Sequence, residues 1–219
     1  MSEATVSDDL YARGLAGDLL WVRYETGAVR PLPVDRWLAP PTRADESALA
    51  RTVAPVLDVG CGPGRHVLAL ARQGVLAVGV DVAPAAVRHA RRRGAPALLA
   101  DVFDRVPGTG QWGSALLLDG NIGIGGRPDL LLRRLATLLR PDGRVVCELS
   151  APGLGTAREL VHLEGREGRR SPWFGWARVS VDDIDAVAAP ANLHSVERWE
   201  ASGRWFAVLT DVSPRAPGG

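Results

Sequence analysis

Short apolar runs alternate with segments of helical spacing through the middle of the chain, from about residue 53 to residue 149. Each run has the length of a buried strand, and the apolar residues of each following segment recur at the interval of one helix face. The predicted strands are 56–59, 76–81, 97–100, 114–121 and 144–149, and the predicted helices start after Gly64 and cover 85–93 and 129–139. Strands and helices in this alternation favour a doubly wound, mostly parallel sheet.

The N-terminal part of the chain has a different pattern. Residues 7–20 predict a moderately amphipathic helix that acts as a lid or cap, although two glycines within it weaken the prediction. We therefore divide the chain into an N-terminal cap with its lead-in, 1–52, and a main domain, 53–212. The last residues, 213–219, are expected to form a disordered tail.

The C-terminal third begins with a predicted helix at 156–163. A glycine- and arginine-rich loop and a group of aromatic residues follow, and together they form an insertion at about 153–178. A further helix ends near Ala189, and two strands joined at Ser202–Gly203 form an antiparallel hairpin. With this hairpin the predicted fold is α/β, with a seven-stranded, mostly parallel sheet.

The stretch VLDVGCGPGRH, Val56–His66, joins a predicted strand to a predicted helix through three closely spaced glycines. Glycines at 60, 62 and 64 allow positive φ and let the backbone approach a ligand closely. The helix N-terminus behind them presents unpaired N–H groups, which favour a polar or anionic group. The pattern therefore predicts a ligand-binding loop.

Acidic residues lie at the ends of four predicted strands, namely Asp58, Asp81, Asp101 and Asp119. The carboxyl ends of parallel strands share one edge of the sheet, and ligands of open α/β sheets bind at that edge. Asp81 follows Gly60 by 21 residues, the distance at which a βαβ unit returns a carboxylate to the loop. We therefore expect Asp81 to reach a ribose diol.

The charged residues are nearly balanced, with 26 basic and 25 acidic, and every basic residue is an arginine. A net charge of +1 gives no field that attracts nucleic acid or an anionic membrane. The lack of lysine excludes a Walker phosphate loop, pyridoxal-phosphate chemistry and a lysine nucleophile. The acidic N-terminus, and the lack of an apolar run of about 18 residues, predict a cytoplasmic protein without a signal peptide or membrane span.

The two cysteines, Cys61 and Cys147, are too few and too far apart in the sequence for a zinc cluster. Both lie in segments predicted to belong to the sheet or its edge, where a small buried thiol is the usual state. We therefore predict no metal.

Four motifs occur in a defined order: the acid and glycine triad of Asp58-Val-Gly60-Cys-Gly62-Pro-Gly64, then Asp81, then ADVF with Asp101, and finally LLRPDGRVVCEL at 138–149. Together they resemble the Rossmann-like (class I) S-adenosylmethionine-dependent methyltransferases. In that family the glycine loop wraps the methionine end of the cofactor, the second-strand acid holds the ribose hydroxyls and the third-strand acid meets the adenine amino group. The resemblance implies S-adenosylmethionine as cofactor and these binding residues: Asp58, Gly60, Cys61, Gly62, Gly64, Asp81, Val82, Asp101 and Val102.

The same resemblance implies in-line methyl transfer, which needs no enzyme nucleophile. A base is needed only where the acceptor must lose a proton; the candidate catalytic residues are Asp119, Asn121 and His162, with Glu148 as a further acid on the substrate side. The segment DGNIGIGG lacks the prolines and aromatic residue of the family's amino-methylating branch, which argues against nucleic-acid bases as acceptors. We expect a small-molecule acceptor, methylated on oxygen or nitrogen and enclosed by the N-terminal helix and the 153–178 insertion.

Other interpretations use the same residues. A nicotinamide enzyme would need a glycine or alanine where Arg65 stands, because its fingerprint is GxGxxG. A non-catalytic S-adenosylmethionine-binding interaction protein, and an aminopropyl transferase on the same fold, are the remaining alternatives. The sequence makes no prediction of the oligomeric state.

Overall fold

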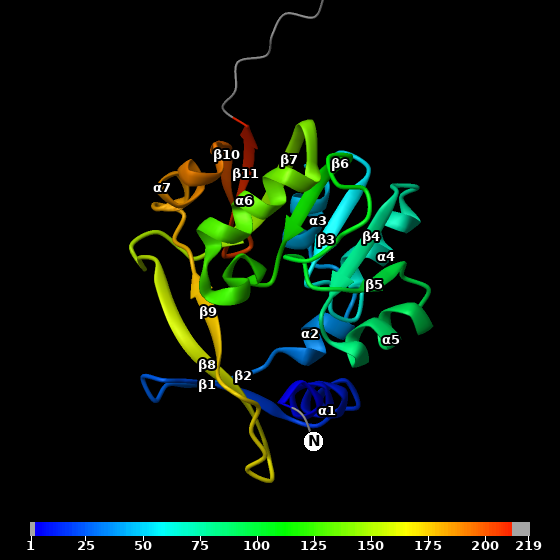
Figure 1. The fold of residues 1–219 in the computed structure, drawn as a ribbon, viewed down its shortest axis with the longest axis vertical. Helices are drawn as coiled ribbons and strands as arrows, with labels where there is room; N and C mark the ends of the chain where they lie inside the picture. Colours follow the sequence, from blue (N-terminus) through cyan, green and yellow to red (C-terminus); the bar gives the residue numbers. More distant parts are fainter. Residues whose placement is uncertain (1–2, 212–219) are drawn as a thin grey trace, which may run out of the picture.

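The computed structural model describes residues 3–211, and its strands form two sheets (Figure 1). The main sheet has seven strands in the order β10-β11-β7-β6-β3-β4-β5, and the second has four in the order β2-β1-β8-β9. The main-sheet strands are β3 (Val56–Val59), β4 (Ala77–Asp81), β5 (Ala97–Leu99), β6 (Trp112–Leu117), β7 (Leu139–Leu149), β10 (Leu193–Ala201) and β11 (Arg204–Asp211). The strands of the second sheet are β1 (Leu20–Tyr24), β2 (Val29–Pro31), β8 (Ala157–Gly165) and β9 (Phe174–Arg178).

The main sheet confirms the predicted doubly wound α/β fold. β3 pairs in parallel with β4 on one side and with β6 on the other. β11 pairs antiparallel with both β7 and β10, as predicted for the C-terminal hairpin. The direction in which successive strands are added therefore reverses between β3 and β6, and ligands of open α/β sheets bind outside the carboxyl ends of the strands at such a switch point.

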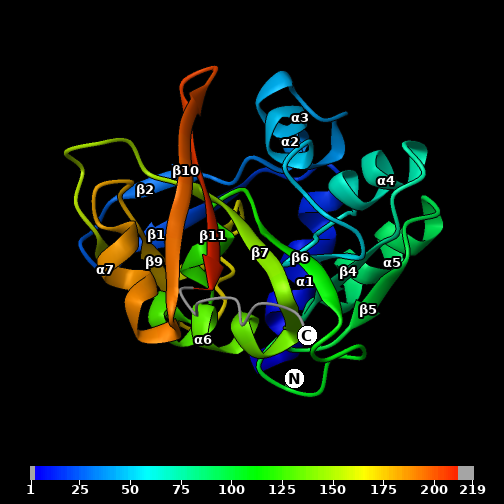
Figure 2. The same ribbon diagram turned by 90° about the horizontal axis from the view of Figure 1, so that it is seen from above.

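Helices cover both faces of the main sheet (Figure 2). The helices are α1 (Glu3–Leu15), α2 (Val34–Leu38), α3 (Arg43–Leu49), α4 (Arg65–Arg72), α5 (Pro84–Arg92), α6 (Pro128–Leu138) and α7 (Ile184–Ala188), with short 3-10 helices η1 (Asn121–Gly126) and η2 (Ala189–Ala191). Leu57 and Ala115 pack on the face covered by α6 and α7, whereas Val56 and Leu116 pack on the face covered by α3, α4 and α5. Because both faces are buried, β3 and β6 consist largely of apolar residues, which made them visible as short apolar runs.

The four-stranded sheet lies at the carboxyl edge of the main sheet, near α1 and α2 (Figure 1). A small apolar cluster of Leu10, Leu20 and Leu163 joins α1 to β1 and β8. This sheet was not predicted from the sequence. It covers the edge at which the glycine loop and the acidic strand ends are found.

Two helix predictions differ from the structure where strands of this second sheet form: the helix predicted at 7–20 forms only as far as Leu15, and the one predicted at 156–163 does not form. α1 ends at Leu15, because Gly17 adopts a φ of +107° and Leu20 already begins β1. Residues 156–163 lie mainly in β8, which pairs with β1 on one side and with β9 on the other. Pairing with two neighbouring strands overrides the helical preference of this segment.

The remaining differences are small. β7 begins at Leu139, five residues before the strand predicted at 144–149. Ser202 and Gly203 have φ values of +52° and +78°, as expected for a two-residue hairpin turn. The predicted tail, 213–219, lies outside the described residues. Across residues 3–211, no helix has the length and apolar character needed to cross a membrane.

Candidate functional site

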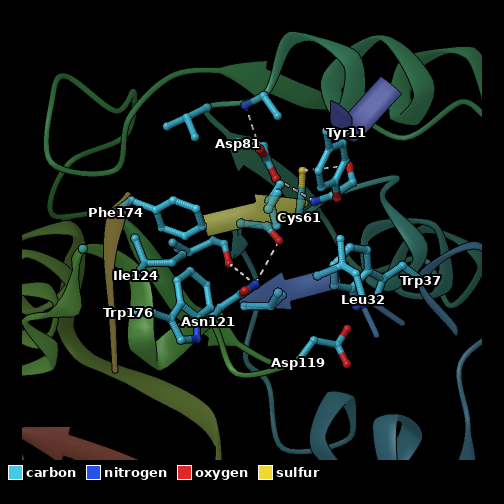
Figure 3. Close-up of a pocket in the computed structure, with 18 of the residues that line it drawn as sticks. Tyr11, Leu32, Trp37, Cys61, Asp81, Asp119, Asn121, Ile124, Phe174 and Trp176 are labelled. Carbon is cyan, nitrogen blue, oxygen red and sulfur yellow. Dashed lines mark hydrogen bonds between the residues drawn. The ribbon is translucent and has the colours of Figure 1, made fainter. Parts of the chain in front are cut away.

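A cavity of about 770 Å³ lies at the switch point, between the main sheet and the four-stranded sheet (Figure 3). The loop after β3 and the ends of β4 and β6 line it on one side, and residues of β1, β8 and β9 line it on the other. Polar groups, including Asp81 and Asp101, gather near β4 and β5, whereas Trp37, Phe174 and Trp176 belong to an apolar part. A polar and an apolar compartment are therefore continuous.

The glycine loop has the backbone geometry predicted for it. Gly60, Gly62 and Gly64 have φ values of +70°, +52° and +81°. A Cβ atom on Gly60 would lie 2.7 Å from Nδ2 of Asn121, and one on Gly64 would lie 2.7 Å from Cβ of Ala95. Glycine is therefore required at these two positions both by backbone conformation and by close packing.

Asp81 and Asp101 lie on the cavity wall, at the edge of the sheet predicted from their positions at the ends of strands. The Asp81 carboxylate accepts hydrogen bonds from the backbone N–H of Gly62 (2.8 Å) and from that of Ala83 (2.9 Å), so it joins the glycine loop to the start of α5. Burial raises the pKa of Asp81, and these two N–H groups partly offset the effect. Asp101 accepts from the backbone N–H of Phe103 (2.9 Å) and is exposed.

Seven of the nine residues predicted to bind the cofactor line the cavity: Gly60, Cys61, Gly62, Asp81, Val82, Asp101 and Val102. The other two do not. Gly64 caps the N-terminus of α4, and Asp58 is buried within β3, with its carboxylate 3.7 Å from Nδ1 of His66. Both lie behind the loop, where they support it from within the fold.

A group of charged side chains, called the ion cluster below, lies behind and beside the glycine loop. Its members are Arg36, Asp45, Asp58, Arg65, His66, Asp119, Glu148 and Arg204. Asp45 is fully buried and accepts from Arg65 (2.6 Å) and from Arg204 (2.7 Å). Arg204 also makes two hydrogen bonds to Glu148, of 2.7 and 2.6 Å. Burial opposes the charge of Asp45, but His66 and the two arginines outweigh burial and hold its pKa far below the usual range.

Asp119 and Asn121, two of the three catalytic candidates, line the cavity at the end of β6. Asp119 has a φ of +55°, and its carboxylate contacts Arg65 (2.7 Å) and Arg36 (3.0 Å) of the ion cluster. Asn121 donates from Nδ2 to the carbonyl oxygens of Val59 (2.8 Å) and Gly60 (2.9 Å). Both side chains therefore hold the glycine loop and its surroundings in place.

His162, the third catalytic candidate, lies outside the cavity lining. Its neighbours Val161 and Leu163 face the cavity, and side chains of a strand alternate between its two faces. The His162 ring packs edge-on against Trp173, with centroids 4.4 Å apart, and is buried. In the predicted helix at 156–163 the His162 ring could have pointed toward the acceptor. In β8 it points to the face of the strand opposite to Val161 and Leu163.

Tyr11 and Trp37 line the cavity and were not predicted from the sequence, whereas Phe174 and Trp176 belong to the 153–178 insertion that was expected to enclose the acceptor. Tyr11 of α1 and Trp37 of α2 stack with their ring centroids 6.0 Å apart, and Phe174 and Trp176 come from β9. Burial, with the nearby Asp81, Cys61 and Asp119, raises the pKa of Tyr11 well above its ordinary value. The period-two placement of Phe174 and Trp176 was the one local signal, and it is meaningful only once the segment is known to be a strand.

Within the ion cluster, His66 gives a prediction about stability. Burial lowers the pKa of His66, but the carboxylates of Asp45 and Asp58, each 3.7 Å from the ring, raise it to about 9. The folded-state pKa lies above the unfolded value of about 6.5, so the stabilisation is complete below that pH and is lost as the pH rises toward 9. We expect the free energy of unfolding from urea titrations to fall by about 2 kcal/mol between roughly pH 6 and pH 8.5.

The control for this prediction is His66→Gln, which has no titrating ring and should lose most of the pH slope. The chosen range stays below about pH 8.5, where the cysteines of the unfolded chain begin to ionise. A flat profile for the parent protein, or the same slope in both proteins, would contradict the prediction.

Comparison with known proteins agrees with the family resemblance of the sequence motifs. The family model described as a methyltransferase domain matches residues 56–143. Among solved structures, a methyltransferase from Bacteroides fragilis in complex with S-adenosyl-L-homocysteine is 24% identical, with 96% of each chain covered and a TM-score of 0.81. A search of curated proteins gave no match.

Two further solved structures are more distant. The 1,6-didemethyltoxoflavin-N1-methyltransferase of Burkholderia thailandensis is 21% identical, covering 81% of this chain and 82% of its own, with a TM-score of 0.56. A sugar N-methyltransferase of Streptoalloteichus is 20% identical, covering 77% of this chain and 85% of its own, with a TM-score of 0.55. The match to the domain model and the shared fold agree with the sequence motifs: residues 56–143 match a methyltransferase domain, and the chain has the fold of solved S-adenosylmethionine-dependent methyltransferases.

Proposed function

We propose that this chain binds S-adenosylmethionine in the cavity and transfers its methyl group directly to an oxygen or nitrogen atom of a small-molecule acceptor. The observation that carries the proposal is the continuity of the two compartments at the switch point, because direct transfer requires both reactants in one enclosure. When bound, the cofactor supplies an electrophilic methyl group on a sulfonium. The chain's own residues bind, orient and exclude water.

The polar compartment fits a nucleoside with an amino-acid tail. The glycine loop leaves room where Cβ atoms would otherwise stand, and it presents backbone N–H groups at the N-terminus of α4 to a carboxylate. Asp81 is an acceptor-only group suited to a ribose diol, and Asp101 can accept from an exocyclic amine. Tyr11 lies across from Gly62 and would close this compartment from the side of α1.

Neither cysteine supports a covalent route. Cys61 lines the cavity, but burial, with Asp58 and Asp81 nearby, raises the pKa of its thiol far above the ordinary value. Burial raises the pKa of Cys147 to about 12, and its side chain lies within β7. Because only a thiolate is a good nucleophile, direct transfer is favoured. In the described part of the chain, no three or more His, Cys, Asp or Glu side chains are grouped so as to hold a metal ion.

In this proposal Asp119 and Asn121 have positioning roles. Both Asp119 oxygens already accept N–H groups from Arg65, at 2.9 and 2.7 Å. Asn121 fixes the carbonyl groups at the start of the glycine loop, next to the point where the two compartments meet. The acceptor therefore has to bring a nucleophilic lone pair of its own.

Calorimetric titration of the full chain with S-adenosylmethionine and with S-adenosylhomocysteine tests cofactor binding. We expect one site per chain, and a panel of acceptors with methyl-labelled cofactor should give a methylated product. The product's mass distinguishes methyl from aminopropyl transfer. The absence of cofactor binding would overturn the proposal, and cofactor binding without transfer to any acceptor would favour a non-catalytic binding protein.

A further inference from the structure

The apolar compartment has two facing walls of aromatic and aliphatic side chains. Phe174 and Trp176 of β9, with Ile124 of η1, lie on one side of the cavity, and Trp37 and Leu32 lie on the other (Figure 3). Phe174 and Trp176 are edge-on to one another, with ring centroids 6.3 Å apart. Flat faces that line a space of this kind suit a flat ligand, because aromatic rings pack best in offset-stacked or edge-on arrangements.

The four-stranded sheet adds further apolar surface between the walls. Val22 of β1, and Val161 and Leu163 of β8, face the cavity at alternate strand positions. Leu163 is paired with Val22 across the two strands, so they form one continuous apolar surface. A ligand with a charged amine lying on this surface would lose hydration without a compensating partner.

Asp119 provides no free charge for a cation. It belongs to the ion cluster, in which four cationic side chains (Arg36, Arg65, Arg204 and protonated His66) face four carboxylates (Asp45, Asp58, Asp119 and Glu148). The cluster is therefore balanced within itself. A saturated amine, which is protonated at neutral pH, would find here neither an unpaired carboxylate nor an unengaged base to remove its proton.

A positive group lies at the edge of this compartment. Arg30 of β2 lines the cavity, is exposed, and places its guanidinium 5.6 Å from the centre of the Tyr24 ring. Among the side chains of residues 8–211, no carboxylate pairs with it. Arg30 opposes a cationic ligand and can accommodate an anionic substituent.

We propose that the apolar compartment binds a flat aromatic or heteroaromatic acceptor, uncharged or anionic, between the β9 wall and the α2 wall. This inference rests on the proposed function, and it names the acceptor class of that same site. Aromatic acceptors also fit the lack of an unengaged base, because a ring nitrogen or an acidic phenol presents its lone pair without help at neutral pH. Trp37 and Trp176 are the specificity-determining residues, and Arg30 sets the charge preference.

Binding of four matched probes to the full chain saturated with S-adenosylhomocysteine tests the proposal. The probes are 2-naphthol, its saturated counterpart decahydro-2-naphthol, the anion 2-naphthoate and the cation 2-naphthylmethylammonium. We expect 2-naphthol and 2-naphthoate to bind at least about tenfold more tightly than the other two in calorimetric titrations. Equal or tighter binding of the saturated or cationic probe, or failure of both favoured probes to bind, would overturn the proposal.

Variants locate the probe in the cavity. Trp176→Leu and Trp37→Leu should each weaken 2-naphthol binding roughly tenfold and leave the Kd for S-adenosylhomocysteine within about twofold. Trp173→Leu is the matched control, because Trp173 is half exposed, packs on His162 and lies outside the cavity lining. Arg30→Gln should weaken 2-naphthoate but not 2-naphthol.

These outcomes separate the two proposals. Failure of S-adenosylhomocysteine to bind the parent protein counts against the proposed function. If S-adenosylhomocysteine binds normally but Trp173→Leu and Trp176→Leu lose the same affinity for 2-naphthol, the result counts only against the aromatic acceptor.

Discussion

Replacing Asp81 with alanine should raise the Kd for S-adenosylhomocysteine by at least about 100-fold. A carboxylate that accepts from both hydroxyls of a ribose makes two charge-assisted hydrogen bonds, each worth about 1.5–3 kcal/mol, and a tenfold change in affinity corresponds to about 1.4 kcal/mol. The Asp81 carboxylate also joins the glycine loop to α5 by accepting from the N–H groups of Gly62 and Ala83, and the substitution removes this connection. Calorimetric titration measures the change directly.

Asp104→Ala is the matched control for this experiment. Asp104 is an exposed acid three residues beyond Asp101, and it lies outside the cavity lining. The Asp104→Ala protein should bind S-adenosylhomocysteine with a Kd within about twofold of that of the parent protein. Thermal unfolding of both variants shows whether the fold is retained. A folded Asp81→Ala protein with unchanged affinity would contradict the ribose role.

Replacing Arg65 with methionine should lower the free energy of unfolding by about 3–5 kcal/mol, because the change removes one partner from a buried ion pair and leaves a charge uncompensated. The Arg65 side chain is nearly inaccessible and contacts the carboxylates of both Asp45 and Asp119. Methionine preserves much of the side-chain volume, so the loss is electrostatic more than steric. Urea unfolding at constant pH gives the value.

Arg13→Met provides the comparison for Arg65→Met. Arg13 pairs with Asp18 and Glu167 at the surface, where ion pairs contribute little, and its unfolding midpoint should match that of the parent protein. If Arg65→Met unfolds at the same urea concentration as Arg13→Met, the ion cluster does not stabilise the fold.

The parts of the fold that were predictable from sequence have local causes. The central strands β3 and β6 are buried on both faces, so Val56 and Leu57 are part of a short apolar run. The glycine loop was visible because its positive φ values demand a particular residue type. Asp81 was placed correctly because the length of a βαβ unit fixes where the second strand ends.

The second sheet was not predictable in this way, because its pairing partners are distant. Trp21 of β1 pairs with Glu164 of β8, and nothing in either segment alone indicates the other. Without that pairing, ARELVHLE reads as a helix, and His162 is then free to face the substrate. His162 was predicted to face the substrate because its segment was predicted to be a helix. In a strand, side chains alternate between two faces, and His162 lies on the face away from the cavity.

The ion cluster was also hidden, because its contacts join residues far apart in the chain. Arg65 entered the sequence argument only as a mismatch to a dinucleotide fingerprint. In the structure Arg65 contacts Asp45, which is 20 residues away in the sequence, and Asp119, which is 54 residues away. Arg204 contacts Asp45 although 159 residues separate them in the sequence. Charges at such separations carry no local periodicity, so only the folded chain brings them together.

The position of Arg204 determines when the site can be completed during synthesis. β11, which carries Arg204, lies between β7 and β10 near the edge of the sheet and is the last strand of the described chain. Until the ribosome has released this strand, Asp45 and Glu148 lack their shared guanidinium and β7 has an unpaired edge. A nascent chain can therefore form its glycine loop before the electrostatic support behind that loop is complete, because that support needs Arg204 of β11.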